Sequence, residues 1–192
     1  MRKNREFRPD KEGTGLLNKL YLTSVQRRAL LKWGLYALLL VLLSIVQDVM
    51  LCRFRVYGAT TDLVPCGIFL ISILEGSESG CVFTLLASWI YLYTGTAPGP
   101  YSIVFITVLG VCGSILRQVY LQKGFGAALL CVGVCLVLYE LSVFGIGLFL
   151  GMTFPDRIVG FFITAGLSVL AVPALYPLAL WIQTLGGETW KE

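Results

Sequence analysis

The sequence predicts an all-α integral membrane protein with about six transmembrane helices, the second and third of them short. Of its 192 residues, 57% are hydrophobic and only 14% are charged, and the mean hydropathy is +0.81. A water-soluble domain needs a more polar surface than this composition provides. The apolar residues also gather in successive runs, several of which are long enough to cross a lipid bilayer.

Residues 1–28 form a basic tail before the first apolar run. Nine of the 15 Lys and Arg residues precede or open that run. No interleaved aromatic platform accompanies them, so the tail indicates membrane topology and not nucleic-acid binding. A helix on the membrane surface and a disordered tail both fit its apolar residues, which are Leu16, Leu17, Leu20, Tyr21 and Val25.

The predicted membrane domain covers residues 29–184 and begins with a helix from Ala29 to Leu51. Lys32 and Trp33 lie at its start, where a snorkelling lysine and an interfacial aromatic ring are expected. This run is long enough for a complete span.

The next two apolar runs, Leu63–Leu74 and Cys81–Thr94, are short for a hydrocarbon core of about 30 Å. A polar turn, residues 75–80, separates them. They fit either two short spans or a hairpin that only dips into the membrane. Both alternatives return the chain to the same side, so the topology of the later helices does not depend on the choice.

Three further helices complete the predicted domain. A breaker rich in Gly and Pro precedes a fourth span, Tyr101–Leu116. A fifth apolar run covers Gly124–Met152. The sixth, Ile158–Ile182, contains Pro173 and Pro177, and we expect it to bend near its end.

The distribution of basic residues predicts the orientation. With the N-terminus inside, the inner segments carry twelve Lys and Arg residues and the outer loops carry three. By the positive-inside rule, the N-terminal tail and the short C-terminal tail of residues 185–192 both lie in the cytoplasm.

Glu140 is the first candidate functional residue, because a carboxylate in the middle of an apolar run is costly unless it is paired, protonated or facing a polar interior. It shares one helical stripe with Gly126, Gly133 and Gly147, and Gly147 forms a GxxxG pair with Gly151. The stripe is a candidate face for helix packing or partner contact. Glu140 itself fits a partner helix, a ligand or a proton path, and it also fits a structural hydrogen bond inside the bundle.

No residue pattern predicts catalysis, a metal or a cofactor. The chain has no histidine, which removes a Cys/His zinc site and the usual general base. The serines lack a GxSxG context, and no GxxxxGK[ST] loop is present. Asp48 and Asp62 are expected at the membrane interface without a catalytic role. We therefore expect a protein that is not an enzyme.

Four positions follow one another in the order of a known family. Gln47 precedes a segment in which Gly58 and Asp62 open the short second span, and this span ends at Gly76. From about residue 35 to residue 155, the pattern resembles the bacterial rod-shape-determining protein MreD. One departure is that residues 87–92 lack the aspartate that family members often carry at the end of the third span.

The resemblance implies a non-enzymatic multi-pass scaffold in the bacterial cytoplasmic membrane, within the cell-elongation complex that synthesises peptidoglycan. Such a protein binds an MreC-like single-span partner and, indirectly, MreB filaments and peptidoglycan synthases. The MreD family is also similar in fold to the substrate-binding subunits of energy-coupling-factor vitamin transporters, which supplies the alternative function. There Glu140 and Tyr139 would face an interior cavity, to which the helices add only Gln47, Asp48 and Trp89.

Overall fold

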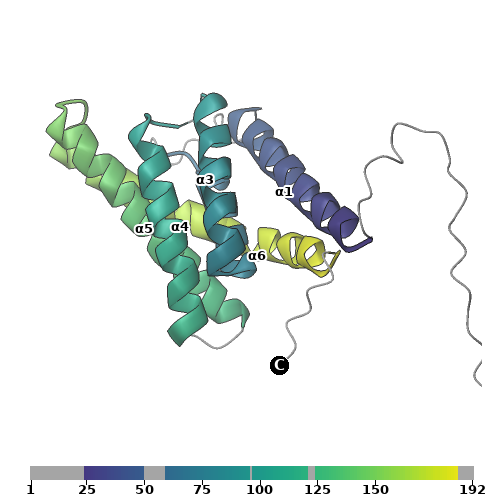
Figure 1. Ribbon diagram of the computed structural model, residues 1–192. Helices are drawn as coiled ribbons and strands as arrows, with labels where there is room; N and C mark the ends of the chain where they lie inside the picture. Colours follow the sequence, from purple (N-terminus) through teal and green to yellow (C-terminus); the bar gives the residue numbers. More distant parts are fainter. Residues whose placement is uncertain (1–23, 50–58, 96, 121–123, 186–192) are drawn as a thin grey trace, which may run out of the picture.

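The computed structural model describes residues 24–49, 59–95, 97–120 and 124–185, and its regular elements in these ranges are helices (Figure 1). The expected all-α fold with six helices is confirmed for this part of the chain. In order, the elements are α1 (Ser24–Val49), α2 (Leu63–Glu75), α3 (Ser77–Tyr93), α4 (Tyr101–Tyr120), α5 (Phe125–Phe149), the short 3-10 helix η3 (Pro155–Arg157) and α6 (Ile158–Leu185).

Helices α1, α4, α5 and α6 are long and apolar enough to cross a membrane. Helices α2 and α3 are short, as expected, with 13 and 17 residues. The outer surfaces of the long helices expose many large apolar side chains. Water-soluble proteins rarely expose apolar side chains over the whole surface of a helical bundle, so these helices indicate association with a membrane.

Helix α2 lies at the centre of the bundle. It contacts each of the five other α-helices, and all 13 of its residues are buried. Figure 1 shows α3 and α4 side by side, with α1 on one flank and α5 on the other, while α6 crosses behind them. A helix covered on every side must be apolar all round, and the sequence of α2 meets this requirement with few exceptions.

A single residue, Gly76, separates α2 from α3. Its φ of 88° lies in the left-handed region that glycine adopts without strain. The two helices then pack closely at Gly80, where an added Cβ would lie 2.6 Å from the carbonyl oxygen of Ser72. The predicted polar turn of residues 75–80 was therefore too long, because Ser77–Gly80 already form the first turn of α3.

Other helices extend beyond their predicted bounds. Helix α1 begins at Ser24 and not at Ala29, because its first polar residues still belong to the helix. Helix α6 runs to Leu185 and includes both Pro173 and Pro177. The predicted tails of residues 1–28 and 185–192 fall largely outside the described residues.

Candidate functional site

The two ends of α2 lie inside the bundle, and the groups that bind them define the candidate site. Every helix leaves unpaired N–H groups at its start and unpaired C=O groups at its end. Thirteen residues span only about 20 Å, less than a hydrocarbon core of about 30 Å. Since lipid offers no hydrogen bonds, protein groups must satisfy both ends.

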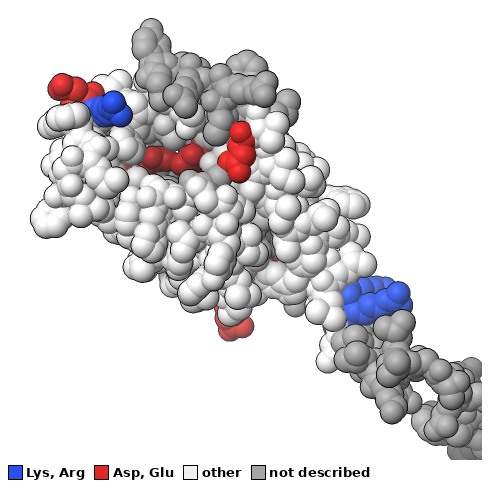
Figure 2. All heavy atoms as spheres, turned by 90° about the horizontal axis from the view of Figure 1, so that it is seen from above, with Lys and Arg blue, Asp and Glu red and all other residues white. Residues whose placement is uncertain are grey.

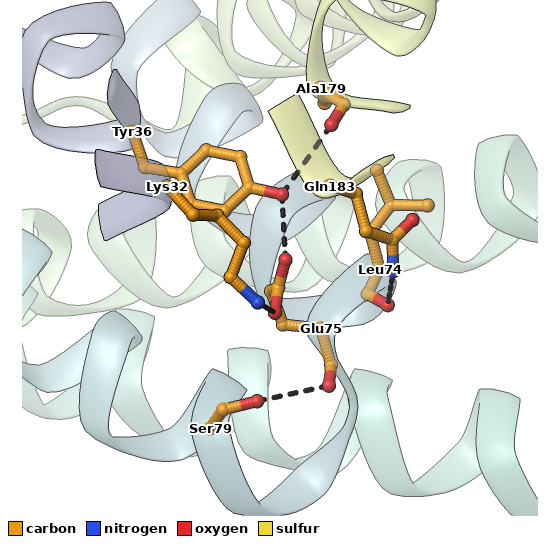
Figure 3. Close-up of polar contacts among 7 residues, drawn as sticks. All are labelled: Lys32, Tyr36, Leu74, Glu75, Ser79, Ala179 and Gln183. Carbon is orange, nitrogen blue, oxygen red and sulfur yellow. Dashed lines mark hydrogen bonds and ion pairs between the residues drawn. The ribbon is translucent and has the colours of Figure 1, made fainter. Parts of the chain in front are cut away.

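At the end where α2 stops, here called the Glu75 end, side chains of α4 and α6 bind its last carbonyl groups. The Arg117 guanidinium donates to the Ile73 carbonyl oxygen at 2.8 Å. The Gln183 amide donates to the Leu74 carbonyl oxygen at 2.8 Å (Figure 3). These two contacts replace the solvent that would bind the end of an exposed helix.

The Glu75 carboxylate forms a buried ion pair with Lys32 of α1, at 2.7 Å between Nζ and Oε2. The Tyr36 hydroxyl donates to the other carboxylate oxygen, also at 2.7 Å (Figure 3). Lys32 and Glu75 are only 5% and 7% exposed, and buried charges are tolerated when they are paired and hydrogen-bonded. The expectation that Lys32 snorkels to the membrane surface is wrong, because its counter-ion lies within the bundle.

Three aromatic rings pack beside this ion pair. Trp33, Tyr36 and Phe83 lie with their ring centroids 5.7–5.9 Å apart. Tilted rings at this separation pack favourably and exclude water. The low local dielectric strengthens the attraction between Lys32 and Glu75.

At the end where α2 begins, here called the Asp62 end, Gln47 of α1 binds two groups. Its Oε1 accepts the backbone N–H of Val64 at 3.0 Å, and its Nε2 donates to Asp62 Oδ1 at 3.4 Å. The Asp62 N–H donates to Ser168 Oγ of α6 at 2.9 Å. Asp62 was expected at the membrane interface, but these bonds tie it between α1 and α6, whereas Asp48 is exposed.

Glu140 of α5 lies beside Asp62, and the two carboxyl groups interact. The phenol groups of Tyr91 in α3 and Tyr139 in α5 interact with both carboxyl groups and with each other, and Tyr139 also interacts with Ser102 of α4. We call Asp62, Tyr91, Tyr139 and Glu140 the Glu140 cluster. Glu140 Oε1 and both phenol oxygens are buried, yet they have no hydrogen-bond partner among the described residues.

The Asp62 end opens toward one face of the molecule. Figure 2 views the bundle from that end and shows acidic side chains inside a hollow of the surface. Asp62 is partly exposed, whereas Glu140 is 5% exposed. Within the Glu140 cluster, Asp62 therefore lies nearer to the surface and Glu140 lies deeper in the bundle.

The predicted glycine stripe does not form one free face. An added Cβ at Gly126 would meet nothing within 4 Å, but at Gly133 it would lie 3.6 Å from Val169 of α6. At Gly147 the position is already filled by Thr153, 2.9 Å away. Glu140 is turned into the bundle with Gly147, so most of the stripe packs within this chain.

Two other predicted positions lie outside the stripe's helix or outside the described residues. Gly151 follows the end of α5 and adopts a φ of 71° in the turn toward η3, so it does not continue a GxxxG pair on the helix. Of the family-like positions, Gln47 and Asp62 meet at one end of α2, and Gly76 forms the turn at the other. Gly58 falls outside the described residues.

The sequence did not predict the pairing of Lys32 with Glu75 or the place of Tyr91 in the Glu140 cluster. Glu75 was assigned to a polar turn, although its position directly after an apolar run and the presence of Lys32 in another run offered a signal for pairing. Tyr91 offered no such signal, because an aromatic residue in an apolar helix is ordinary core. The described residues contain no group of three or more His, Cys, Asp and Glu side chains that would hold a metal ion.

Comparisons of the chain with protein-family models, with curated proteins and with solved structures found no match.

Proposed function

We propose that this chain is a non-enzymatic multi-pass scaffold of the bacterial cell-elongation complex, similar to MreD in its role. In this proposal it lies in the cytoplasmic membrane with both termini inside. It binds an MreC-like single-span protein and, through it, MreB filaments and the peptidoglycan synthases. The proposal rests on the resemblance of the sequence pattern and on the positions of the residues that carry that pattern.

The observation that carries the proposal is the position of Gln47, Asp62 and Gly76 around α2. Gln47 binds Asp62 and the first turn of α2, and Gly76 makes the turn into α3. The motif residues thus serve one task, which is to hold a half-length helix in the centre of the bundle. This shared task is a physical reason for the three residues to occur together, and it supports the resemblance.

The positive-inside pattern supports the proposed orientation. In it, the Glu75 end of α2 lies toward the cytoplasm and the Asp62 end toward the outside. Reporter fusions after residues 56 and 122, which fall in an outer loop and an inner loop of this topology, test it. Activity of a periplasmic reporter at residue 122 would contradict the orientation.

The structure of α5 sharpens the choice of variant for testing partner contact. Gly126 is exposed, and a Cβ added there would meet no described residue within 4 Å, so we expect Gly126→Leu to leave the bundle intact. Gly147→Leu would collide with Thr153 and confuse folding with binding. Gly166→Leu on α6, which is equally open, is the matched control.

The experiment is a mild-detergent pull-down of tagged full-length protein from its native membrane, with mass spectrometry of the co-purifying proteins. We expect an MreC-like single-span protein and peptidoglycan synthases with the unaltered chain and with Gly166→Leu. A reduced recovery with Gly126→Leu assigns the contact to the start of α5, and an unchanged recovery excludes that face. Recovery of paired ATPases with a coupling membrane subunit would replace the scaffold by the transporter alternative.

A further inference from the structure

Three oxygen atoms inside the bundle lack hydrogen-bond partners among the described residues. They are Glu140 Oε1 and the phenol oxygens of Tyr91 and Tyr139. These residues are 5%, 1% and 0% exposed. Burial of an unsatisfied polar group costs free energy, and native proteins rarely leave three such groups together. Their presence in one place points to an occupant that supplies hydrogen bonds.

The three atoms belong to one cluster that joins three helices. Tyr91 comes from α3, Tyr139 and Glu140 come from α5, and Asp62 precedes α2. Each phenol group interacts with the other and with both carboxyl groups. An edge-on contact between Tyr139 and Phe69 of α2, with centroids 6.2 Å apart, closes one side of the cluster.

The charge of the cluster is negative and is not balanced by a described cation. Asp62 and Glu140 contribute two carboxyl groups, and the Gln47 amide that binds Asp62 is neutral. The buried Lys32 and the half-buried Arg117 lie at the Glu75 end, where Lys32 binds Glu75 and Arg117 binds a carbonyl group. A cationic occupant would therefore offset both the charge and the missing hydrogen bonds.

We propose that the Glu140 cluster binds a primary ammonium group. An R–NH₃⁺ group has three N–H donors and no acceptor, which matches the three unpartnered oxygens in number and in polarity. The rings of Tyr91 and Tyr139 add aromatic surface that attracts cations. A metal ion fits less well, since hard cations take six or more oxygen ligands and the described residues offer no group of three metal-ligating side chains.

The ammonium group has two possible sources, a free amine or the headgroup of an ethanolamine lipid. Both reach the cluster by the same route, through the hollow at the Asp62 end (Figure 2). Asp62 is the partly exposed residue of the cluster, and its negative charge would attract a cation before the cation reaches Glu140. The site does not depend on which protein partner the chain has.

Calorimetry and thermal unfolding of the delipidated full-length protein in detergent test the proposal. We expect methylammonium to bind and raise the Tm, because it carries three N–H donors. Tetramethylammonium and sodium carry the same charge as methylammonium but have no N–H donor. Both should therefore have little effect on the Tm. Equal binding of all three cations would overturn the proposal, and so would the absence of methylammonium binding.

Conservative variants locate the site. Glu140→Gln and Tyr139→Phe keep the shape of the side chains but remove the carboxyl group or the phenol hydroxyl group. Each should weaken methylammonium binding at least about tenfold, the effect of one hydrogen bond to a charged group. Asp48→Asn, at an exposed carboxylate near the same end, is the matched control and should leave binding unchanged. Unchanged binding in both cluster variants would overturn the assignment.

Nanodiscs of defined lipid composition distinguish the two sources of the ammonium group. In nanodiscs of phosphatidylethanolamine, methylammonium should compete poorly if the headgroup occupies the site, and it should bind normally if the natural occupant is a free amine. Phosphatidylcholine nanodiscs are the control, because choline carries no N–H donor. Either result supports a primary ammonium site. Recovery of the protein partner in the pull-down is scored separately, so failure of one proposal leaves the other standing.

Discussion

The two ends of α2 differ in how completely the polar groups around them are hydrogen-bonded. At the Glu75 end, both carboxylate oxygens of Glu75 and the last carbonyl groups of the helix are bound by side chains of α1, α4 and α6. At the Asp62 end, the backbone is bound, but Glu140 and two tyrosines remain unsatisfied among the described residues. The first end is closed and structural. The second end keeps buried polar groups without partners among the described residues, and such groups need an explanation beyond the packing of the helices.

The Lys32–Glu75 ion pair should carry the largest effect on stability. Lys32→Met leaves a buried carboxylate without its counter-ion, and breaking such a pair costs about 3–5 kcal/mol. We expect this loss in the free energy of unfolding, measured in mixed detergent and SDS micelles. The Tyr36 hydroxyl, at 2.7 Å from Glu75, compensates only in part because it is neutral.

A double variant distinguishes the pair from simple loss of packing. Lys32→Met with Glu75→Met removes both charges and keeps apolar volume, so it should recover most of the lost stability. If the double variant is as unstable as Lys32→Met alone, packing and not the unpaired charge explains the loss.

The close contact between α2 and α3 at Gly80 should show the next largest effect. Gly80→Ala places a Cβ 2.6 Å from the backbone oxygen of Ser72, and such overpacking costs about 1–3 kcal/mol. Gly34→Ala is the control, because its Cβ meets nothing within 4 Å and alanine favours the helix. Equal thermal stability of the two variants would show that the α2–α3 contact adjusts freely.

The sequence predicted the central helix well but not the contacts that close it. The run Leu63–Leu74 ends at a charge followed by glycine, so α2 was located within one residue. In contrast, Gln183 binds the carbonyl group of Leu74 across 109 residues of chain. Hydropathy identifies which segments are helices, but it contains no information about which distant side chain meets which end.

The candidate site was predicted only in part, again because the sequence does not reveal contacts between distant residues. Glu140 was found because a carboxylate inside an apolar run is conspicuous, whereas Asp62 and Tyr91 join it only through the packing of α2 and α3. The seven-residue spacing of the stripe predicted a close-packed face, and two of its positions, Gly133 and Gly147, do face neighbouring side chains. It did not reveal that α6 and Thr153 of the same chain already cover that face.

Removal of Gln47 tests whether the backbone at the Asp62 end is as firmly bound as at the other end. Gln47→Leu leaves the Val64 N–H without its acceptor at 3.0 Å, and an unsatisfied buried donor costs about 1–3 kcal/mol. Hydrogen exchange should increase in the first turn of α2 while its last turn remains protected. Exchange that rises equally along all of α2 would show that the two ends unfold as one unit.

The smallest effect on stability should come from Glu140→Gln, which makes the same chemical change as Glu75→Gln at the other buried glutamate. Glu75→Gln leaves Lys32 unpaired and should cost several kcal/mol, as a broken buried ion pair does. Glu140→Gln replaces a carboxyl group that no described cation balances, so the free energy of unfolding should change by less than about 1 kcal/mol or increase. Unfolding of both variants in the same micelles measures the difference. Equal losses would mean that Glu140 also closes the bundle, and the distinction between a structural end and a functional end of α2 would then fail.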